Sequence, residues 1–276
     1  KKPDEIIQYF VPYLIYYQYN RYEDAKWCAI KALELAQKQK NEEMKINILN
    51  CIGLVLFQEG KFAEALSKHK EALFLSKEIN NIYETSKSLL NIGQIYKSQG
   101  AYPKALKHIQ LAITIIRDLD DDELFSNTLY KIGQLYYEME NYEKAFDFLK
   151  QSLNYTIKNG DLNGRAHCLN DIAMIYCETK KYNEAIDYYD KALKIYQKLS
   201  DLSEVATQFN NLAIVYHKKG HLNKALKYIK RSIEILEILG VQAGIETHYN
   251  NIGTFYASEK NYTESLKWHK KAIFVE

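Results

Sequence analysis

The apolar positions of the chain recur at steps of three and four residues, which predicts amphipathic helices. The stretch from residue 83 to 119 shows this pattern, because one face of its first half carries an apolar series: Leu89, Ile92, Gly93 and Tyr96. Gly100 is expected to end this helix, since glycine readily adopts the left-handed conformation, and Pro103 lies where a second helix would begin. The second helix carries its own series: Ala105, Ile109, Ala112 and Ile116. The stretch therefore predicts a helical hairpin.

The hairpin pattern recurs every 40 residues. A small residue repeats at this interval without a break: Gly53, Gly93, Gly133, Ala173, Ala213 and Gly253. A tyrosine follows it by three residues in five of the repeats: Tyr96, Tyr136, Tyr176, Tyr216 and Tyr256. A second small residue follows it by twelve: Ala65, Ala105, Ala145, Ala185, Ala225 and Ser265. With a diverged first copy, the chain is read as seven repeats, the last cut short at Glu276: approximately 3–40, 41–80, 81–120, 121–160, 161–200, 201–240 and 241–276.

Turn residues separate the predicted helices. The first helix of each repeat is expected to end at one recurring position: Asn20, Gly60, Gly100, Glu140, Lys180, Gly220 and Lys260. Where glycine is missing, Asn141 and Asn261 come next and are expected to take the left-handed geometry, whereas Lys180-Lys181 lacks this help. Between repeats, four polar runs are expected to supply turns and helix caps: Asn80-Asn81, Asp120-Asp121-Asp122, Gly160-Asp161 and Ser200-Asp201.

The repeated small residue has a packing role in this prediction. Glycine or alanine on the first helix lets the second helix approach closely, and the tyrosine fills the space beside it. A two-helix repeat cannot bury both of its faces alone, so each repeat is expected to stack on the next. The sequence thus predicts an all-α solenoid of seven hairpins in one continuous domain, residues 1–276, whose first helices line the inner wall.

Composition narrows the functional classes. The 37 basic and 35 acidic residues give a net charge of +2, too weak to indicate a nucleic-acid or membrane surface. No stretch reaches the roughly 18 apolar residues that a membrane-spanning helix needs, and no cleavable leader is visible. Four cysteines without a CxxC pattern favour reduced thiols and a cytoplasmic setting: Cys28, Cys51, Cys168 and Cys177.

The polar residues do not form a recognisable catalytic or metal-binding pattern. His217 and His221 are four residues apart but lie on either side of the helix-ending Gly220, and His69 and His269 fall in a column that packs between helices. The sequence contains no phosphate-binding loop and no nucleophile elbow. We therefore expect neither an enzyme nor a cofactor.

The repeat resembles the tetratricopeptide repeat. The resemblance rests on Asn91-Ile92-Gly93-Gln94-Ile95-Tyr96, on Gly100-Ala101-Tyr102, and on Ala105 and Ala112. The period of 40 residues, rather than 34, is similar to the subclass found in kinesin light chains, Pins-type adaptors and bacterial peptide-sensing regulators and sensor kinases. This resemblance implies a right-handed superhelix whose concave groove binds proteins or peptides.

Asparagines gather on the face that the resemblance assigns to the groove. Seven lie three or two residues before the small residue of their repeat: Asn50, Asn91, Asn170, Asn210, Asn211, Asn250 and Asn251. A carboxamide can donate to a peptide carbonyl while accepting from a peptide N–H, so this ladder of amides is interpreted as holding an extended backbone. In the resembling subclass, the position two residues before the small residue has this role, which transfers to Asn91, Asn211 and Asn251. The alternative is that the amides bond to neighbouring helices or to water.

Charged and apolar residues complete the predicted groove. Lys87, Lys97 and Lys131 indicate an acidic ligand group. Further along the predicted groove the charge becomes negative, at Asp171, Glu138 and Glu178. The remaining candidates are Gln94, Gln134, Tyr137, Met174 and Ile214. The alternative for each charge is a solvated surface without a binding role. The lysine and asparagine spacing that grips chaperone tails is absent, so such a ligand is disfavoured.

The sequence favours a protein-binding or peptide-binding module in a signalling or scaffolding protein. One alternative is a peptide-sensing domain that controls an attached effector such as a kinase, a DNA-binding domain or a phosphatase. Another is a dimerisation scaffold, because the apolar Ile273-Phe274-Val275 ends the array without a polar cap. An RNA-reading solenoid is a third choice, since acidic residues interrupt the groove lysines.

Overall fold

The computed structural model describes residues 4–117, 119, 121–240 and 244–274, and within these ranges the chain forms fourteen α-helices and no strand. Seven are the first helices of their hairpins: α1 (Asp4–Gln18), α3 (Glu42–Gln58), α5 (Ile82–Ser98), α7 (Asp122–Glu138), α9 (Leu162–Glu178), α11 (Leu202–Lys218) and α13 (Ile245–Ser258). Seven are second helices: α2 (Tyr22–Lys38), α4 (Phe62–Glu78), α6 (Tyr102–Ile116), α8 (Tyr142–Asn159), α10 (Tyr182–Lys198), α12 (Leu222–Ile238) and α14 (Tyr262–Ile273). The all-α repeat architecture expected from the sequence is confirmed.

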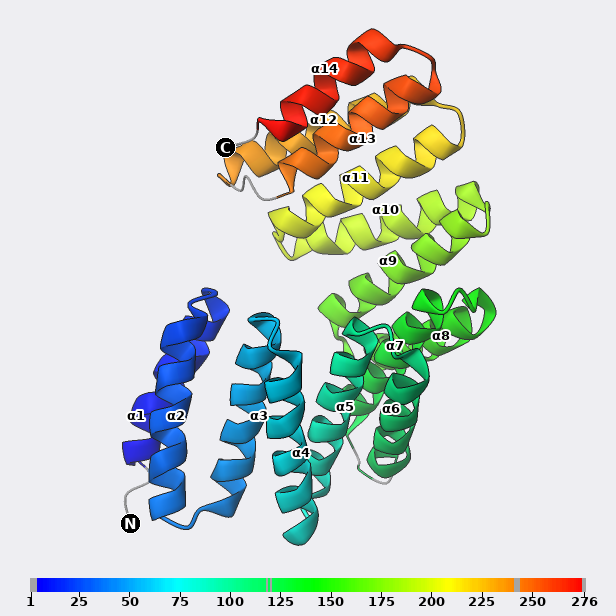
Figure 1. Cartoon of the computed structure of the whole chain (residues 1–276). Coiled ribbons are helices and arrows are strands. Elements are labelled where there is room, and N and C mark those ends of the chain that lie inside the picture. Colours follow the sequence, from blue (N-terminus) through cyan, green and yellow to red (C-terminus); the bar gives the residue numbers. More distant parts are fainter. Residues whose placement is uncertain (1–3, 118, 120, 241–243, 275–276) are drawn as a thin grey trace. The chain divides into compact units, whose positions relative to one another are not determined.

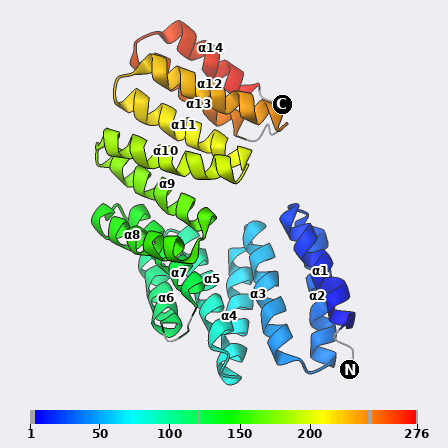
Figure 2. The same ribbon diagram turned by 180° about the vertical axis from the view of Figure 1, so that it is seen from behind.

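The chain divides into two compact parts, which we call the N-terminal half (Lys1–Met139) and the C-terminal half (Glu140–Glu276). In each half, consecutive helices pack against one another in chain order (Figures 1 and 2). Contacts between α3 and α5, and between α11 and α13, also join first helices of successive repeats directly. The first helices therefore form a layer of their own within each half.

A left-handed residue ends nearly every helix, at an interval of 20 residues. Five of these are glycines, but seven are not: Asn20, Lys40, Asn80, Glu140, Lys180, Ser200 and Lys260. The expectation that Asn141 and Asn261 take the left-handed geometry is wrong. Glu140 and Lys260 take it instead, and each asparagine caps the next helix.

The caps explain why polar residues follow the left-handed positions. The side-chain oxygens of Asn41, Asn81, Asp121, Asp161 and Asp201 accept hydrogen bonds from backbone N–H groups three residues further on. These bonds satisfy donors that have no partner inside the helix. The predicted cap in the Asp120-Asp121-Asp122 run is thus Asp121, whereas Asp120 lies outside the described residues.

The repeated small residues mark points where two helices touch. A Cβ built on Gly93 would come within 2.5 Å of Cγ1 of Ile109 in α6. The neighbouring tyrosines cover the same contact from the side, because the rings of Tyr216 and Tyr228 stack with centroids 5.2 Å apart, and those of Tyr176 and Tyr188 lie 5.3 Å apart. Small residue and aromatic ring together let first and second helices pack closely.

In the first hairpin, the large and small residues of this contact are exchanged between the two helices. Tyr13 takes the place of the small residue, and its side chain is only 2% exposed. The facing helix α2 carries the small residues instead, all of them fully buried: Ala25, Ala29, Ala32 and Ala36. Ring stacking of Tyr13 with Phe10 and Tyr17 completes this core. The first hairpin therefore packs closely although it lacks the repeated small residue on its first helix.

A buried imidazole fills the space beside Gly53. His69 of α4 is 1% exposed, and its Nδ1–H donates to Oδ1 of Asn50 over 2.9 Å. The other side of the ring lies against Gly53, where an added Cβ would come within 2.5 Å of Cε1. Burial lowers the pKa of His69 to about 4, so the ring is neutral at physiological pH. The equivalent His269 also contacts its glycine, Gly253, but is only half-buried.

The four cysteines are buried and free. Along the described part of the chain, every helix is too short or too polar to cross a lipid bilayer.

We predict that exchanging residues at the left-handed positions changes stability through the backbone alone. Gly100 has φ of 69°, and an added Cβ would meet no atom within 4 Å, so Gly100→Ala should lower the free energy of unfolding by about 1 kcal/mol. Lys180→Gly removes the same strain at φ of 61° and should raise the free energy of unfolding by about 0.5 kcal/mol, after the entropy cost of glycine is subtracted. Chemical denaturation measures both, and effects of equal sign would contradict the prediction.

We predict that Gly93→Ala destabilises the protein through steric overlap with Ile109. The expected loss is about 1–2 kcal/mol, because overpacking outweighs the better helix propensity of alanine. Combining it with Ile109→Ala should give a double variant that is more stable than the sum of the two single effects implies. Denaturant midpoints of the four proteins form the test, and additive effects would show that the two sites are not in contact.

We predict that His69 makes the folded protein acid-sensitive. Its folded pKa of about 4 lies below the ordinary value of 6.5, so the unfolded chain binds a proton that the folded one does not. Stability contributed by the neutral ring is complete above pH 6.5 and is lost as the pH falls, by roughly 3 kcal/mol near pH 4. Unfolding free energies of the wild type and His69→Gln between pH 7 and 4 should converge, and parallel curves would refute the assignment.

Candidate functional site

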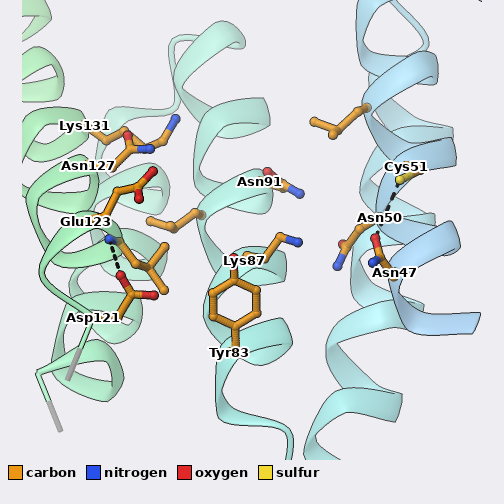
Figure 3. Close-up of a pocket in the computed structure, with 13 residues that line it drawn as sticks. Asn47, Asn50, Cys51, Tyr83, Lys87, Asn91, Asp121, Glu123, Asn127 and Lys131 are labelled. Carbon is orange, nitrogen blue, oxygen red and sulfur yellow. Dashed lines mark hydrogen bonds between the residues drawn. The ribbon is translucent and has the colours of Figure 1, made fainter. Parts of the chain in front are cut away.

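The N-terminal half contains a pocket of about 390 Å³ between α3, α5 and α7 (Figure 3). Each of the three first helices contributes polar side chains, and three leucines and a tyrosine supply apolar surface. The lining residues are Asn47, Asn50, Cys51, Leu54, Tyr83, Lys87, Leu90, Asn91, Asp121, Glu123, Leu124, Asn127 and Lys131. Four of the predicted site residues thus come together here, namely Asn50, Lys87, Asn91 and Lys131.

Asn50 lies at the bottom of a buried polar network. Its Nδ2 donates to Oε2 of Glu84 over 3.0 Å and lies 3.1 Å from Oγ of Ser88, while its Oδ1 accepts from His69. The amide is 3% exposed. Asn50 therefore joins α3 to α4 and α5, and Asn91 reaches the edge of the same network, 3.5 Å from the ring of His69.

The three predicted lysines differ in their surroundings. Lys87 Nζ lies 3.1 Å from Oε1 of the buried Glu84, and Lys97 Nζ lies 3.8 Å from Oε1 of Glu138. Lys131 has no carboxylate within ion-pair distance in the described part of the chain. Burial lowers the pKa of the Lys131 ammonium, and the charge of Lys97 lowers it further.

In the C-terminal half, the asparagines pair across successive first helices. Nδ2 of Asn211 in α11 donates to Oδ1 of Asn170 in α9 over 3.0 Å. In the same way, Nδ2 of Asn251 in α13 donates to Oδ1 of Asn210 in α11 over 2.9 Å. Both pairs span 41 residues of sequence, so each joins one column of the predicted ladder to the other. Among the candidates, the last, Asn250, accepts instead from Nδ1 of His269 over 3.0 Å.

The neighbourhood of Asn170 is more crowded than that of Asn211. Besides accepting from Asn211, Asn170 accepts from Nε2 of Gln208, and its own amide donates to Asp171 and contacts the sulfur of Met174. Asn211 is half-buried, and within the described residues its carbonyl oxygen and second N–H have no partner. Asn211 thus keeps groups that can bind a ligand.

Acidic groups lie close together beside Asp171. Burial raises the pKa of Glu204, and the charges of Asp201 and Asp171 raise it further, whereas His167 lowers it. Tyr196 OH lies 2.9 Å from Nδ1 of His167. At the end of α9, the helix that carries Asp171, Glu178 pairs with Lys218 of α11 over 3.0 Å. The predicted change of sign along the groove is therefore partly offset by ion pairs between repeats.

The remaining predicted residues lie on the first helices without forming one cluster. Gln134 donates to Tyr130 OH over 2.8 Å within α7. Gln94, Tyr137 and Ile214 are half-buried.

Sequence reasoning missed two kinds of residue. Asn47 and Asn127 share the column of Lys87, six residues before the small residue, and could have been found from that register. Glu84 could have been noticed because Glu204 occupies the equivalent place three repeats later. Its partners, however, are Asn50 of α3 and Lys87 of α5, and the period alone does not reveal this pairing.

A hydrogen-bonded serine and histidine occur in the core of the C-terminal half. His248 Nε2 lies 2.8 Å from Oγ of Ser232, and this hydroxyl donates its proton to the carbonyl oxygen of Ala206. Ser232 is fully buried, so the pair joins helices and is closed to substrates. Within the described residues, no three potential ligands gather in a way that could hold a metal ion.

Several solved structures share this fold. The apo form of RapI matches with a TM-score of 0.77 at 16% identity, covering 98% of this chain and 97% of that one. The Rap conjugation gene regulator of plasmid pLS20, in complex with the Phr* peptide, matches with a TM-score of 0.73 at 16% identity, covering 97% and 72%. A signal transduction ATPase with a tetratricopeptide repeat sensor from Pyrococcus horikoshii matches with a TM-score of 0.79 at 20% identity, covering 98% of this chain and 42% of that one. These likenesses concern the fold.

A search of curated protein sequences found no significant match. One family model described as tetratricopeptide repeat matches residues 44–118, 84–158 and 165–238, and a second model of the same description matches residues 247–273. These matches cover more than half of the chain and coincide with the helical hairpins of the structure. The chain therefore belongs to the tetratricopeptide repeat family.

Proposed function

We propose that this chain is a non-catalytic module that binds a peptide segment along the layer of first helices. The observation that carries the proposal is the pairing of Asn211 with Asn170 and of Asn251 with Asn210. Each bond fixes the orientation of a carboxamide that would otherwise rotate freely. Fixed amides bind a ligand with a smaller loss of conformational entropy.

The spacing of the pairs suits an extended peptide backbone. Packed helices lie about 8–10 Å apart, and an extended chain advances about 3.3 Å per residue. Successive amides would therefore meet backbone groups about every third residue of the ligand. Asn211 and Asn251 contribute both a donor and an acceptor, the combination that a peptide group requires. Asn91 occupies the equivalent position in the N-terminal half.

The family relationship supports a binding role. Rap proteins share the fold, and one was solved with the Phr* peptide. The burial of Ser232, which encloses its contact with His248, supports a non-catalytic role for this pair. Four free cysteines favour a reducing, cytoplasmic setting.

A sensor domain is the second candidate. The ATPase from Pyrococcus horikoshii carries its tetratricopeptide repeats as a sensor, and the Rap neighbour is a gene regulator. In this version, a peptide on the first helices would change the activity of an attached effector. A scaffold that dimerises through its last hairpin is a third candidate, favoured by the exposed Tyr262 and Leu266 of α14.

We predict that a peptide-display selection on the protein enriches ligands whose affinity depends on the paired asparagines. The variant Asn211→Ala with Asn251→Ala should lose about 1–3 kcal/mol of binding free energy, because backbone groups of the ligand lose their partners. Fluorescence anisotropy with the synthetic enriched peptides provides the measurement.

The matched control is Asn154→Ala, which removes an exposed amide from the second helix α8. It should leave peptide affinity unchanged. Circular dichroism and denaturant midpoints confirm that the variants fold. A selection without enrichment, or peptides that bind both proteins equally, would reject the proposed function.

A further inference from the structure

The pocket between α3, α5 and α7 contains an ammonium group without a counter-ion. Lys131 is half-buried in the α7 wall, and no carboxylate of the described chain lies within 4.0 Å of its Nζ. The two other lysines of this region differ, since Lys87 is paired with Glu84 and Lys97 lies near Glu138. Lys131 is therefore the cation that remains for a ligand.

An unpaired, partly desolvated ammonium is energetically unfavourable. Its hydration is incomplete, and the neighbouring charge of Lys97 adds repulsion, which agrees with the lowered pKa of Lys131. A carboxylate in contact with Nζ would offset both penalties by its opposite charge and a charge-assisted hydrogen bond. Asn91 and Asn127 line the same pocket and can donate to the second carboxylate oxygen.

The same α7 wall is acidic towards the N-terminus of the helix (Figure 3). Glu123 is exposed and has no ion-pair partner among the described residues. Nearby, Oδ1 of Asp121 accepts the capping hydrogen bond from the backbone N–H of Leu124. Glu123 and Lys131 both belong to α7 and are eight residues apart (Figure 3). With a rise of 1.5 Å per residue, their Cα atoms are separated by about 12 Å along the helix.

We propose that this pocket recognises a pair of opposite charges on an extended peptide: a carboxylate that binds Lys131 and a cationic group that binds Glu123. The two side chains project from Cα positions about 12 Å apart on one helix, a length that three or four residues of an extended chain span. The pocket thereby selects both the spacing of the charges and the direction of the peptide. This inference rests on the proposed peptide-binding function and names the ligand chemistry of the N-terminal half.

The test uses 12-residue peptides selected by display on the full chain and then synthesised with fluorescein. Enriched peptides are expected to carry an acidic and a basic residue three or four positions apart. Replacing either residue by its neutral analogue should weaken binding at least tenfold. Amidated and free C-termini are compared for each peptide, so that an acidic side chain is distinguished from a terminal carboxylate as the source of the charge.

Protein variants assign each charge to its partner. Lys131→Gln should lower the affinity for the parent peptide at least tenfold. The affinity for the peptide without its acidic group should stay unchanged. Glu123→Gln should show the corresponding pattern for the basic group. Matched controls are Lys70→Gln and Glu64→Gln on α4, which alter exposed charges outside the pocket and should change affinity less than twofold.

A charge exchange guards against a variant that merely misfolds. Lys131→Glu should bind a peptide in which lysine replaces the acidic residue more tightly than it binds the parent peptide. Enriched peptides that ignore Lys131 and Glu123, or that lack the charge pair, overturn this inference while leaving the peptide-binding function standing. A selection that enriches nothing overturns both.

Discussion

The fold depends on one close approach that is repeated along the chain, in which the backbone of a first helix touches a side chain of its partner helix. Gly93 against Ile109 and Gly53 against His69 are two forms of this contact. In the first hairpin the small residues move to the second helix, where Ala25 and Ala32 leave room for Tyr13. The chemistry of the contact therefore varies, whereas each of these hairpins keeps its two helices packed against each other.

Much of this architecture could be predicted from the sequence, because it follows from local patterns. The period of 40 residues, the hairpin and the cap residues each depend on a few neighbouring positions, and the structure confirms them. The left-handed residues were harder to assign, since Glu140 and Lys260 adopt a geometry that their residue types disfavour. There, the length of the turn decides the conformation, and Asn141 and Asn261 serve as caps.

The site was predicted less completely, because the partners of each amide come from other repeats. Asn50 and Asn250 bond to a histidine that lies 19 residues further on, whereas Asn170 and Asn210 bond to an asparagine 41 residues further on. The same column thus includes amides enclosed in a core network and amides near the surface. A histidine facing the small residue of the same hairpin binds the amide in two repeats, whereas in two others the amide bonds to the next repeat, and the asparagine column alone does not distinguish these cases.

The reach of these interactions has a consequence for how the chain folds. The hydrogen bonds between first helices connect residues no more than 41 positions apart. Each hairpin therefore gains its stabilising contacts from itself and its immediate neighbours, as in a one-dimensional lattice. Adding or removing a whole repeat in the interior would leave the sequence separation of all other contacts unchanged. The time needed to form the native contacts is then expected to depend on a single hairpin and its neighbour rather than on the full length of the array.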